Sequence, residues 1–225
     1  MDKEQYTPGI VYQDNFLIVC EKPYGVSSQK STKANMIDML EQKLKREVFV
    51  CNRLDITTTG LIVYAFDKST CAAINAQLSG DSFEKEYLAI VHGRTKSEDK
   101  LEDFIYHDAL TNKSFIVSEK KKNAKIAKLF YSTEKATTIK DDICSLVRIK
   151  LLTGRTHQIR VQFANQGHPL FGDGKYGAKD NSDLALHCSK ISFAHPNDGV
   201  TMMFSSEPPD KEPWNTFFKN INMAK

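Results

Sequence analysis

The segment from Asn52 to Gly60 (NRLDITTTG) places an acid, a base and three hydroxyl groups between two apolar stretches. Connections between strands are where a rigid scaffold presents functional side chains. Asp55 is the acid, and the guanidinium of nearby Arg53 would favour its ionised form, which can act as a nucleophile or a base. An Asp that forms a turn or caps backbone amides has the same local composition, and local composition alone favours that alternative.

A second polar segment runs from Leu152 to Arg160 (LTGRTHQIR). Here Arg155 follows a glycine just before a predicted helix, a placement that could aim its guanidinium into a cleft. Helix N-termini and guanidinium groups both favour anions, so phosphate or a carboxylate is the natural partner. A helix cap with solvated basic residues remains the alternative. The histidines lack the spacing of metal ligands, so we expect them to form hydrogen bonds or lie on the surface: His157, His168, His187 and His195.

Composition limits the class of protein. The chain of 225 residues is 40% hydrophobic and 26% charged, as in ordinary globular proteins. Its five cysteines are odd in number and widely spaced, with no C-x-x-C pair, which favours a reducing compartment over a disulfide framework or zinc site. No apolar run approaches the roughly 18 residues that span a bilayer. We therefore expect a cytoplasmic protein without a membrane partner.

Apolar patterning predicts the elements around Asp55. Residues 10–22 form two extended segments around the turn-forming pair Asp14-Asn15. The apolar spacing in residues 34–46 is that of an amphipathic helix. Residues 48–51 and 61–66 are predicted buried strands, so Asp55 is expected on the connection between them.

The rest of the chain continues this mixture of strands and helices. A helix capped by Asp67 or Ser69 should end at Gly80. Thr156 and Gly167 can cap another helix over residues 156–166, although the alternation of its apolar residues is also typical of a strand. The remaining predicted elements are strands 86–91 and 145–152, a hairpin of 191–194 with 200–204 closed by a type I′ turn at Asp198-Gly199, and a short last helix.

The ordered set of motifs resembles the RluA-type pseudouridine synthases. EKPYG is similar to the start of that family, and NRLDITTTGLIVYA to its aspartate signature. The segments KEYLAIVHG, AKIAKLFY, LLTGRTHQIRVQFANQGHPLFGDGKYG and LALHCSKISFAHP then follow in the family's order. The resemblance implies an α+β fold, with a large mixed, mostly antiparallel central sheet flanked by helices and loops around an active-site cleft.

The same resemblance implies the site residues. Asp55 takes the place of the catalytic aspartate, Tyr87 that of the active-site tyrosine, and Arg155 that of the arginine that pairs with the aspartate. Asn52 and Ile56 depart from the family's usual histidine and lysine, which bears on substrate specificity more than on activity. The expected RNA-binding residues are Arg53, Thr58, His157 and Arg160, together with the basic run Lys120, Lys121 and Lys122.

The implied reaction breaks the bond between ribose and the base nitrogen of a uridine in RNA, turns the uracil and rejoins it through carbon. No cofactor or metal is implied. The target base must be flipped out of its stack. Asp55 would attack the sugar or remove one of its protons, Tyr87 would stack on the uracil and remove a ring proton, and Arg155 would orient Asp55.

We expect residues 1–225 to form a single catalytic domain without a separate N-terminal RNA-binding module, and the protein to be a monomer. Its partner would be a stem-loop of ribosomal or transfer RNA. Two rival functions are a glycosidase, which needs a second carboxylate that we do not find, and a non-catalytic RNA-binding protein derived from this fold. The combination of Asp55, Tyr87 and Arg155 argues against the latter.

Overall fold

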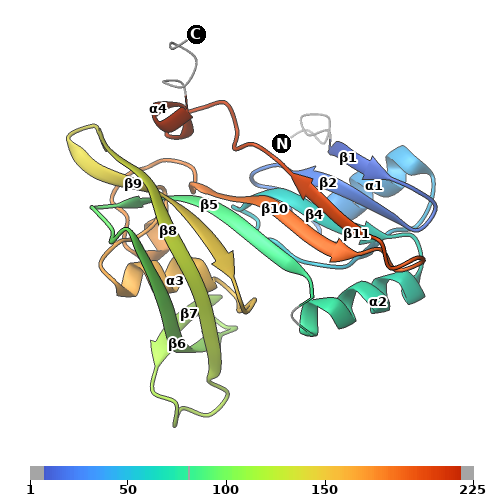
Figure 1. The fold of residues 1–225 in the computed structure, drawn as a ribbon, viewed down its shortest axis with the longest axis horizontal. Coiled ribbons are helices and arrows are strands. Elements are labelled where there is room, and N and C mark those ends of the chain that lie inside the picture. Colours follow the sequence, from blue (N-terminus) through green and yellow to red (C-terminus); the bar gives the residue numbers. More distant parts are fainter. Residues whose placement is uncertain (1–7, 81, 219–225) are drawn as a thin grey trace. The chain divides into compact units, whose positions relative to one another are not determined.

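The computed structural model describes residues 8–80 and 82–218, which divide into two compact units (Figure 1). Unit 1 comprises Met1–Lys85 and His187–Glu207, and unit 2 comprises Glu86–Leu186 and Pro208–Lys225. No helix within the described residues is long and apolar enough to cross a membrane. The expectation of one catalytic domain over residues 1–225 stays a prediction.

Unit 1 is built on a mixed sheet with strand order β1-β2-β4-β10. Strand β2 pairs antiparallel with β4, whereas β4 pairs in parallel with β10 through Thr59 and His187. Every residue of β4 is buried, which explains its unbroken apolar run. The strands are β1 (Gly9–Gln13), β2 (Leu17–Lys22), β3 (Phe49–Val50, paired with β4), β4 (Thr59–Ala65), β10 (Leu186–Ala194) and β11 (Thr201–Ser205, paired with β10).

Two helices of unit 1 begin and end near the predicted residues. Helix α1 (Met36–Leu44) is capped by Asn35, whose side chain accepts from the backbone N–H of Asp38. Helix α2 (Lys68–Ser79) is capped by Asp67 and ends at Gly80, as predicted. The side-chain amide of Gln77 exchanges two hydrogen bonds with the backbone of Ala194, at 2.7 and 2.8 Å, and so fixes α2 to β10.

The sheet of unit 2 is antiparallel, with strand order β5-β9-β8-β6-β7. The long β8–β9 hairpin is its centre (Figure 1). Both predicted strands, 86–91 and 145–152, are confirmed with slightly different ends. The strands are β5 (Glu84–His92), β6 (Glu98–Asp108), β7 (Lys113–Val117), β8 (Lys125–Ile139) and β9 (Asp142–Leu151).

Helix α3 (Gln158–Asn165) covers one face of this sheet, where Val161 packs with Ile105 and Ala127. The helix predicted over residues 156–166 is therefore confirmed. Its predicted cap is wrong, because His157 rather than Thr156 occupies the N-cap, and the C-cap is Gln166, one residue before Gly167. A short 3-10 helix, η2 (Gly174–Tyr176), follows.

The last described helix, α4 (Trp214–Phe218), closes a second core of unit 2. Trp214 and Phe217 are 3% and 2% exposed and belong to one apolar cluster with Leu88 and Ile90 of β5. The short helix expected near the end of the chain is thus confirmed, and its two large side chains account for its placement.

The β10–β11 hairpin is confirmed, but its predicted two-residue turn is wrong. Strand β10 ends at Ala194 and β11 begins at Thr201. His195 and Val200 close the loop, because the N–H of His195 donates to the carbonyl of Val200 at 2.8 Å. Of the pair Asp198-Gly199, the glycine alone adopts positive φ, whereas a type I′ turn needs it at both positions.

All five cysteines are free thiols within the described residues. Cys71 on α2 is partly exposed, and the other four are buried. Burial raises the pKa of the Cys20 thiol to about 12 and that of Cys144 to about 11.

Candidate active site

The loop that carries Asp55 connects β3 with β4 in unit 1, as the sequence indicated. The N–H of Thr58 donates to the carbonyl of Asp55 at 3.0 Å and closes a turn immediately after the carboxylate. The side chain of Asp55 is half-buried. A carboxylate in this position is held by a defined backbone and still reaches solvent.

The residues on either side of Asp55 are both fixed to the segment 22–28. The hydroxyl of Ser28 donates to the carbonyl of Leu54 at 2.8 Å. The carbonyl of Ile56 accepts from the N–H of Gly25 at 2.9 Å and from Nζ of Lys22 at 3.0 Å. These bonds restrict the backbone at the two positions next to the carboxylate, which is the support that a preorganised catalytic group requires.

The other polar residues of this loop differ in exposure. Asn52 is 6% exposed and its Oδ1 accepts from the N–H of Val63 at 2.8 Å, while its Nδ2 has no partner within the described residues. Arg53 is exposed, and its Nη1 donates to Gln29 at 3.2 Å. Thr58 is 2% exposed. Of the two RNA-binding residues expected here, Arg53 is accessible and Thr58 is enclosed by protein.

Tyr87 lies on β5 in unit 2 and is 6% exposed. It pairs with Ile149 of β9, which in turn pairs with Tyr131 of β8, so the three side chains share one face of the sheet. The ring of Tyr131 contacts Phe163 of α3, with the ring centroids 5.0 Å apart. Tyr87 therefore points to the face on which α3 packs.

The turn before α3 holds Arg155 against β8. Its Nε donates to the carbonyl of Ile126 at 3.0 Å, and its backbone N–H donates to Oε1 of Gln158 at 3.0 Å. Gln158 also accepts from Thr153 at 2.8 Å and donates to the carbonyl of Lys128 at 3.1 Å. Side chains thus satisfy backbone groups of the helix entry, and the half-buried guanidinium is presented from a fixed turn.

Arg160 is 7% exposed and is paired inside unit 2. Its Nε and Nη2 donate to the two carboxylate oxygens of Asp173, each at 2.7 Å, in a bidentate ion pair. The guanidinium also lies 5.2 Å from the centroid of the Tyr176 ring. The structure therefore gives Arg160 a buried partner, where the sequence suggested an RNA phosphate.

His157 is also buried, at 8% exposed, and has the left-handed φ of 54°. Its Nδ1 lies 2.9 Å from the hydroxyl of Tyr176, which accepts from the N–H of Ser114 at 2.8 Å. Because that hydroxyl can then donate its proton to His157, the ring is oriented from within the protein. This network links the start of α3 with β7 and η2.

The predicted basic run lies on the connection between β7 and β8. Lys120, Lys121 and Lys122 are all exposed, and Nζ of Lys121 lies 5.0 Å above the ring of Tyr106. Lys128, further along on β8, pairs with Glu102 at 3.1 Å. The three loop lysines therefore present positive charge to solvent.

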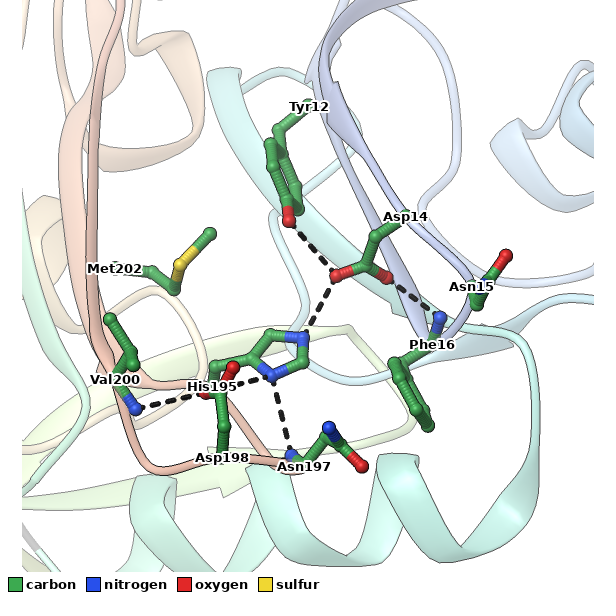
Figure 2. Close-up of a pocket in the computed structure, with 9 residues that line it drawn as sticks. All are labelled: Tyr12, Asp14, Asn15, Phe16, His195, Asn197, Asp198, Val200 and Met202. Carbon is green, nitrogen blue, oxygen red and sulfur yellow. Dashed lines mark hydrogen bonds and ion pairs between the residues drawn. The ribbon is translucent and has the colours of Figure 1, made fainter.

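A cavity of about 250 Å³ lies elsewhere in unit 1, between the β1–β2 turn and the β10–β11 loop (Figure 2). Nε2 of His195 lies 2.8 Å from the carboxylate of Asp14, and the hydroxyl of Tyr12 donates to the same carboxylate at 3.0 Å. Burial acts to raise the pKa of Asp14, but the hydrogen bonds from Leu17, Phe16, Tyr12 and His195 outweigh it and lower the pKa. None of the predicted catalytic residues lines this cavity.

Two residues that position the Asp55 loop were missed in the sequence. Lys22 ends an apolar strand, where a lysine normally turns to solvent, and its involvement could be suspected only from the EKPYG motif. His187 lies within LALHC, and its bond to Thr59 links segments 128 residues apart. Local patterning carries no signal for such a distant contact. Within the described residues, no group of three or more His, Cys, Asp or Glu side chains could hold a metal ion.

Comparison with known proteins assigns the family. The family model described as RNA pseudouridylate synthase matches residues 16–165. Ribosomal large subunit pseudouridine synthase C of Buchnera aphidicola (strain Sg) is 28% identical over 97% of this chain and 71% of its own length. Dual-specificity RNA pseudouridine synthase RluA of Haemophilus influenzae is 30% identical over 88% of this chain and 92% of its own length. The chain therefore belongs to the RNA pseudouridylate synthase family.

Solved structures support the same fold. Human RNA pseudouridylate synthase domain containing 1 is similar over 93% of this chain and 86% of its own, with a TM-score of 0.80 and 23% identity. The domain-containing-4 protein covers 90% of this chain with a TM-score of 0.72. Among the sequence relatives, ribosomal large subunit pseudouridine synthase C of H. influenzae is 30% identical, and this chain covers 64% of its length. The predicted family, α+β fold class and RNA-modifying isomerase are confirmed.

Proposed function

We propose that this protein isomerises uridine to pseudouridine in structured ribosomal or transfer RNA and that Asp55 is its catalytic carboxylate. The observation that carries the proposal is the Asp55 loop itself. In a chain of this family, it holds a half-buried carboxylate whose flanking residues, Leu54 and Ile56, are both anchored through their carbonyls. A residue serving only as a turn former would not need such support on both sides.

In the proposed reaction, the bond between C1′ of the ribose and N1 of the uracil breaks. The base turns, C1′ bonds to C5, and the proton displaced from C5 is matched by the proton gained at N1. Asp55 either attacks C1′ or removes the proton from C2′, and it is required in both routes. All bonds that break and form in the net reaction belong to the uridine, so the reaction needs no oxidant or reductant.

Tyr87 and Arg155 are proposed to complete the site. Tyr87 would stack on the extruded uracil and accept the C5 proton, and Arg155 would orient Asp55 and favour its charged form. We further propose that residues 1–225 act as one catalytic domain. Loss of any of the three should abolish or strongly reduce turnover.

Recognition of RNA is proposed to rest on exposed cations. Arg53 and the loop lysines Lys120, Lys121 and Lys122 are exposed, and phosphate contacts are a common purpose of such residues. The burial of Thr58, His157 and Arg160 favours roles in supporting the protein. We further propose that the enzyme is a cytoplasmic monomer that takes a stem-loop of ribosomal or transfer RNA. The ribosomal large subunit is named in the description of one relative.

The test uses unmodified transcripts of large-subunit ribosomal RNA and of transfer RNAs. Wild type, Asp55→Ala and Asp55→Asn are incubated with each RNA, and new pseudouridines are mapped by carbodiimide labelling and reverse transcription. Asp141→Asn, an exposed aspartate on the β8–β9 turn, is the matched control. Wild type and control should modify discrete uridines, and both Asp55 variants should modify none while still binding RNA.

The rival function, an RNA-binding protein without catalysis, predicts a different result. Wild type would then bind the transcripts in a gel-shift assay and leave every uridine unchanged. A second inconsistent outcome is an Asp55→Ala variant that retains the modification, which would assign the chemistry to another residue.

A further inference from the structure

Lys22 is buried at the end of β2 beside the Asp55 loop, and the side chain is 1% exposed. Its Nζ donates to the carbonyls of Pro23 and Val26, each at 2.9 Å, and to that of Ile56 at 3.0 Å. An ammonium has three N–H donors and a neutral amine has two. Three acceptors at these distances therefore match the charged form of lysine.

The carbonyl of Ile56 makes this contact relevant to catalysis. Ile56 directly follows Asp55, and it lies 34 residues from Lys22 in the sequence. The other two acceptors belong to the turn after β2, so one ammonium joins that turn to the Asp55 loop. Removing it would leave buried carbonyls without their donor, and unsatisfied polar groups cost free energy.

The charge of Asp55 also acts on Lys22. Burial lowers the pKa of Lys22 to about 7, and the negative charge of Asp55, on the loop that packs against the ammonium, acts to raise it. Glu21, the neighbouring acid on β2, instead accepts a hydrogen bond from Ser206.

We propose that Lys22 is a positioning residue for Asp55, one that fixes the backbone of the Asp55 loop through the carbonyl of Ile56. The proposal rests on the proposed function, because it gives Lys22 its role through the chemistry of Asp55. Lys22 itself does not contact the substrate.

The first experiment compares Lys22→Met, which keeps the length and apolar stem, with Ser28→Ala, which removes the tether at Leu54 without changing charge. Lys22→Met should lower kcat by roughly tenfold to a hundredfold through misplacement of the carboxylate, with a smaller change in KM for RNA. Ser28→Ala should lower kcat less, because it removes one hydrogen bond to a backbone carbonyl and Lys22→Met removes three.

The second experiment needs no activity and keeps the proposal testable if Lys22→Met does not fold. The pKa of Lys22 is measured by NMR in wild type and in Asp55→Asn, with circular dichroism confirming the fold of both. Removing the carboxylate should lower the pKa of Lys22. An unchanged pKa of Lys22 in Asp55→Asn, or a folded Lys22→Met with wild-type kcat, overturns the proposal. A protein that shows the NMR shift but makes no pseudouridine instead refutes the proposed function.

Discussion

Oγ1 of Thr59 and Nδ1 of His187 lie 2.9 Å apart, and this buried hydrogen bond joins β4 to β10 four residues after Asp55. Nε2 of His187 lies 3.3 Å from the carbonyl of Ser206, so that nitrogen is the donor and Nδ1 accepts from the Thr59 hydroxyl. Burial lowers the pKa of His187 to about 4. The ring is therefore neutral at physiological pH, as both bonds require.

This relationship predicts a loss of stability in acid. The pKa of His187 is about 4 in the folded protein, and its ordinary value is 6.5. Between these pH values the unfolded chain therefore binds a proton at His187 more tightly than the folded protein does. The free energy of unfolding should thus fall as pH drops from 6.5 to 4, by up to roughly 3 kcal/mol. Urea unfolding of wild type and His187→Gln across this range measures the difference, which should shrink towards acid. A constant difference contradicts the assignment.

The ion pair of Arg160 with Asp173 predicts a stability defect. Arg160→Met leaves the carboxylate of Asp173, which is 1% exposed, without its partner, and should lower the free energy of unfolding by about 3–5 kcal/mol. Exposed Arg53→Met is the control and should change it by less than about 0.5 kcal/mol. Denaturant titration compares the two. Should Arg160→Met keep its stability and lose RNA affinity instead, the original RNA-binding interpretation of Arg160 is restored.

The loop lysines predict a salt-dependent change in RNA affinity. Replacing Lys120, Lys121 and Lys122 together by alanine should weaken binding and reduce the slope of log affinity against log salt by about 2, the value for three contacts to single-stranded RNA. Fluorescence anisotropy at several salt concentrations gives the slope. The control replaces three exposed lysines of unit 1, Lys33, Lys43 and Lys68, with the same loss of charge. Equal slopes for the two variants would mean that net charge, rather than the loop, is responsible.

Two glycines with positive φ form a matched pair. A Cβ on Gly60 would lie 2.3 Å from the carbonyl oxygen of Cys188, whereas one on Gly167 would meet nothing within 4 Å. Gly167→Ala therefore carries only the backbone strain, about 1–2 kcal/mol. Gly60→Ala adds a backbone clash between β4 and β10 and should lose considerably more, seen as low soluble yield and a lower Tm. Equal losses would show that the sheet can open at Gly60.

Patterns within one element predicted much of the fold. Asp67 and Gly80 bounded α2 correctly because a side-chain cap and a terminal glycine act within the helix itself. Thr156 is not the N-cap of α3. Its carbonyl accepts a hydrogen bond from the hydroxyl of Ser114 on β7 at 2.6 Å, and the next residue, His157, adopts the left-handed conformation and is the N-cap. The type I′ turn predicted at Asp198-Gly199 is absent for a related reason. His195, in the same loop, is held by Asp14, which lies 181 residues away in the sequence.

The position of the candidate site along the chain could be predicted, whereas the contacts that support it could not. Asp55 and Arg155 stand in polar segments flanked by apolar ones, and the order of the motifs along the chain made them candidates. The motif could not show that Arg160 is buried. The fold of the segment after α3 brings Asp173 against Arg160, and this contact depends on tertiary structure. Lys22 was hidden for the same reason, since three backbone carbonyls, which have no sequence signature, bind its ammonium.

The distribution of thiols makes the native enzyme suitable for site-selective labelling. Maleimides react with accessible thiolates, and four of the five cysteines are buried, with Cys20 and Cys144 further protected by their raised pKa values. A fluorophore should therefore attach at Cys71 on α2, which is partly exposed, without any engineered cysteine. Unfolding would expose the remaining four cysteines. The number of labels per molecule therefore distinguishes native protein, with one label, from unfolded protein, with up to five.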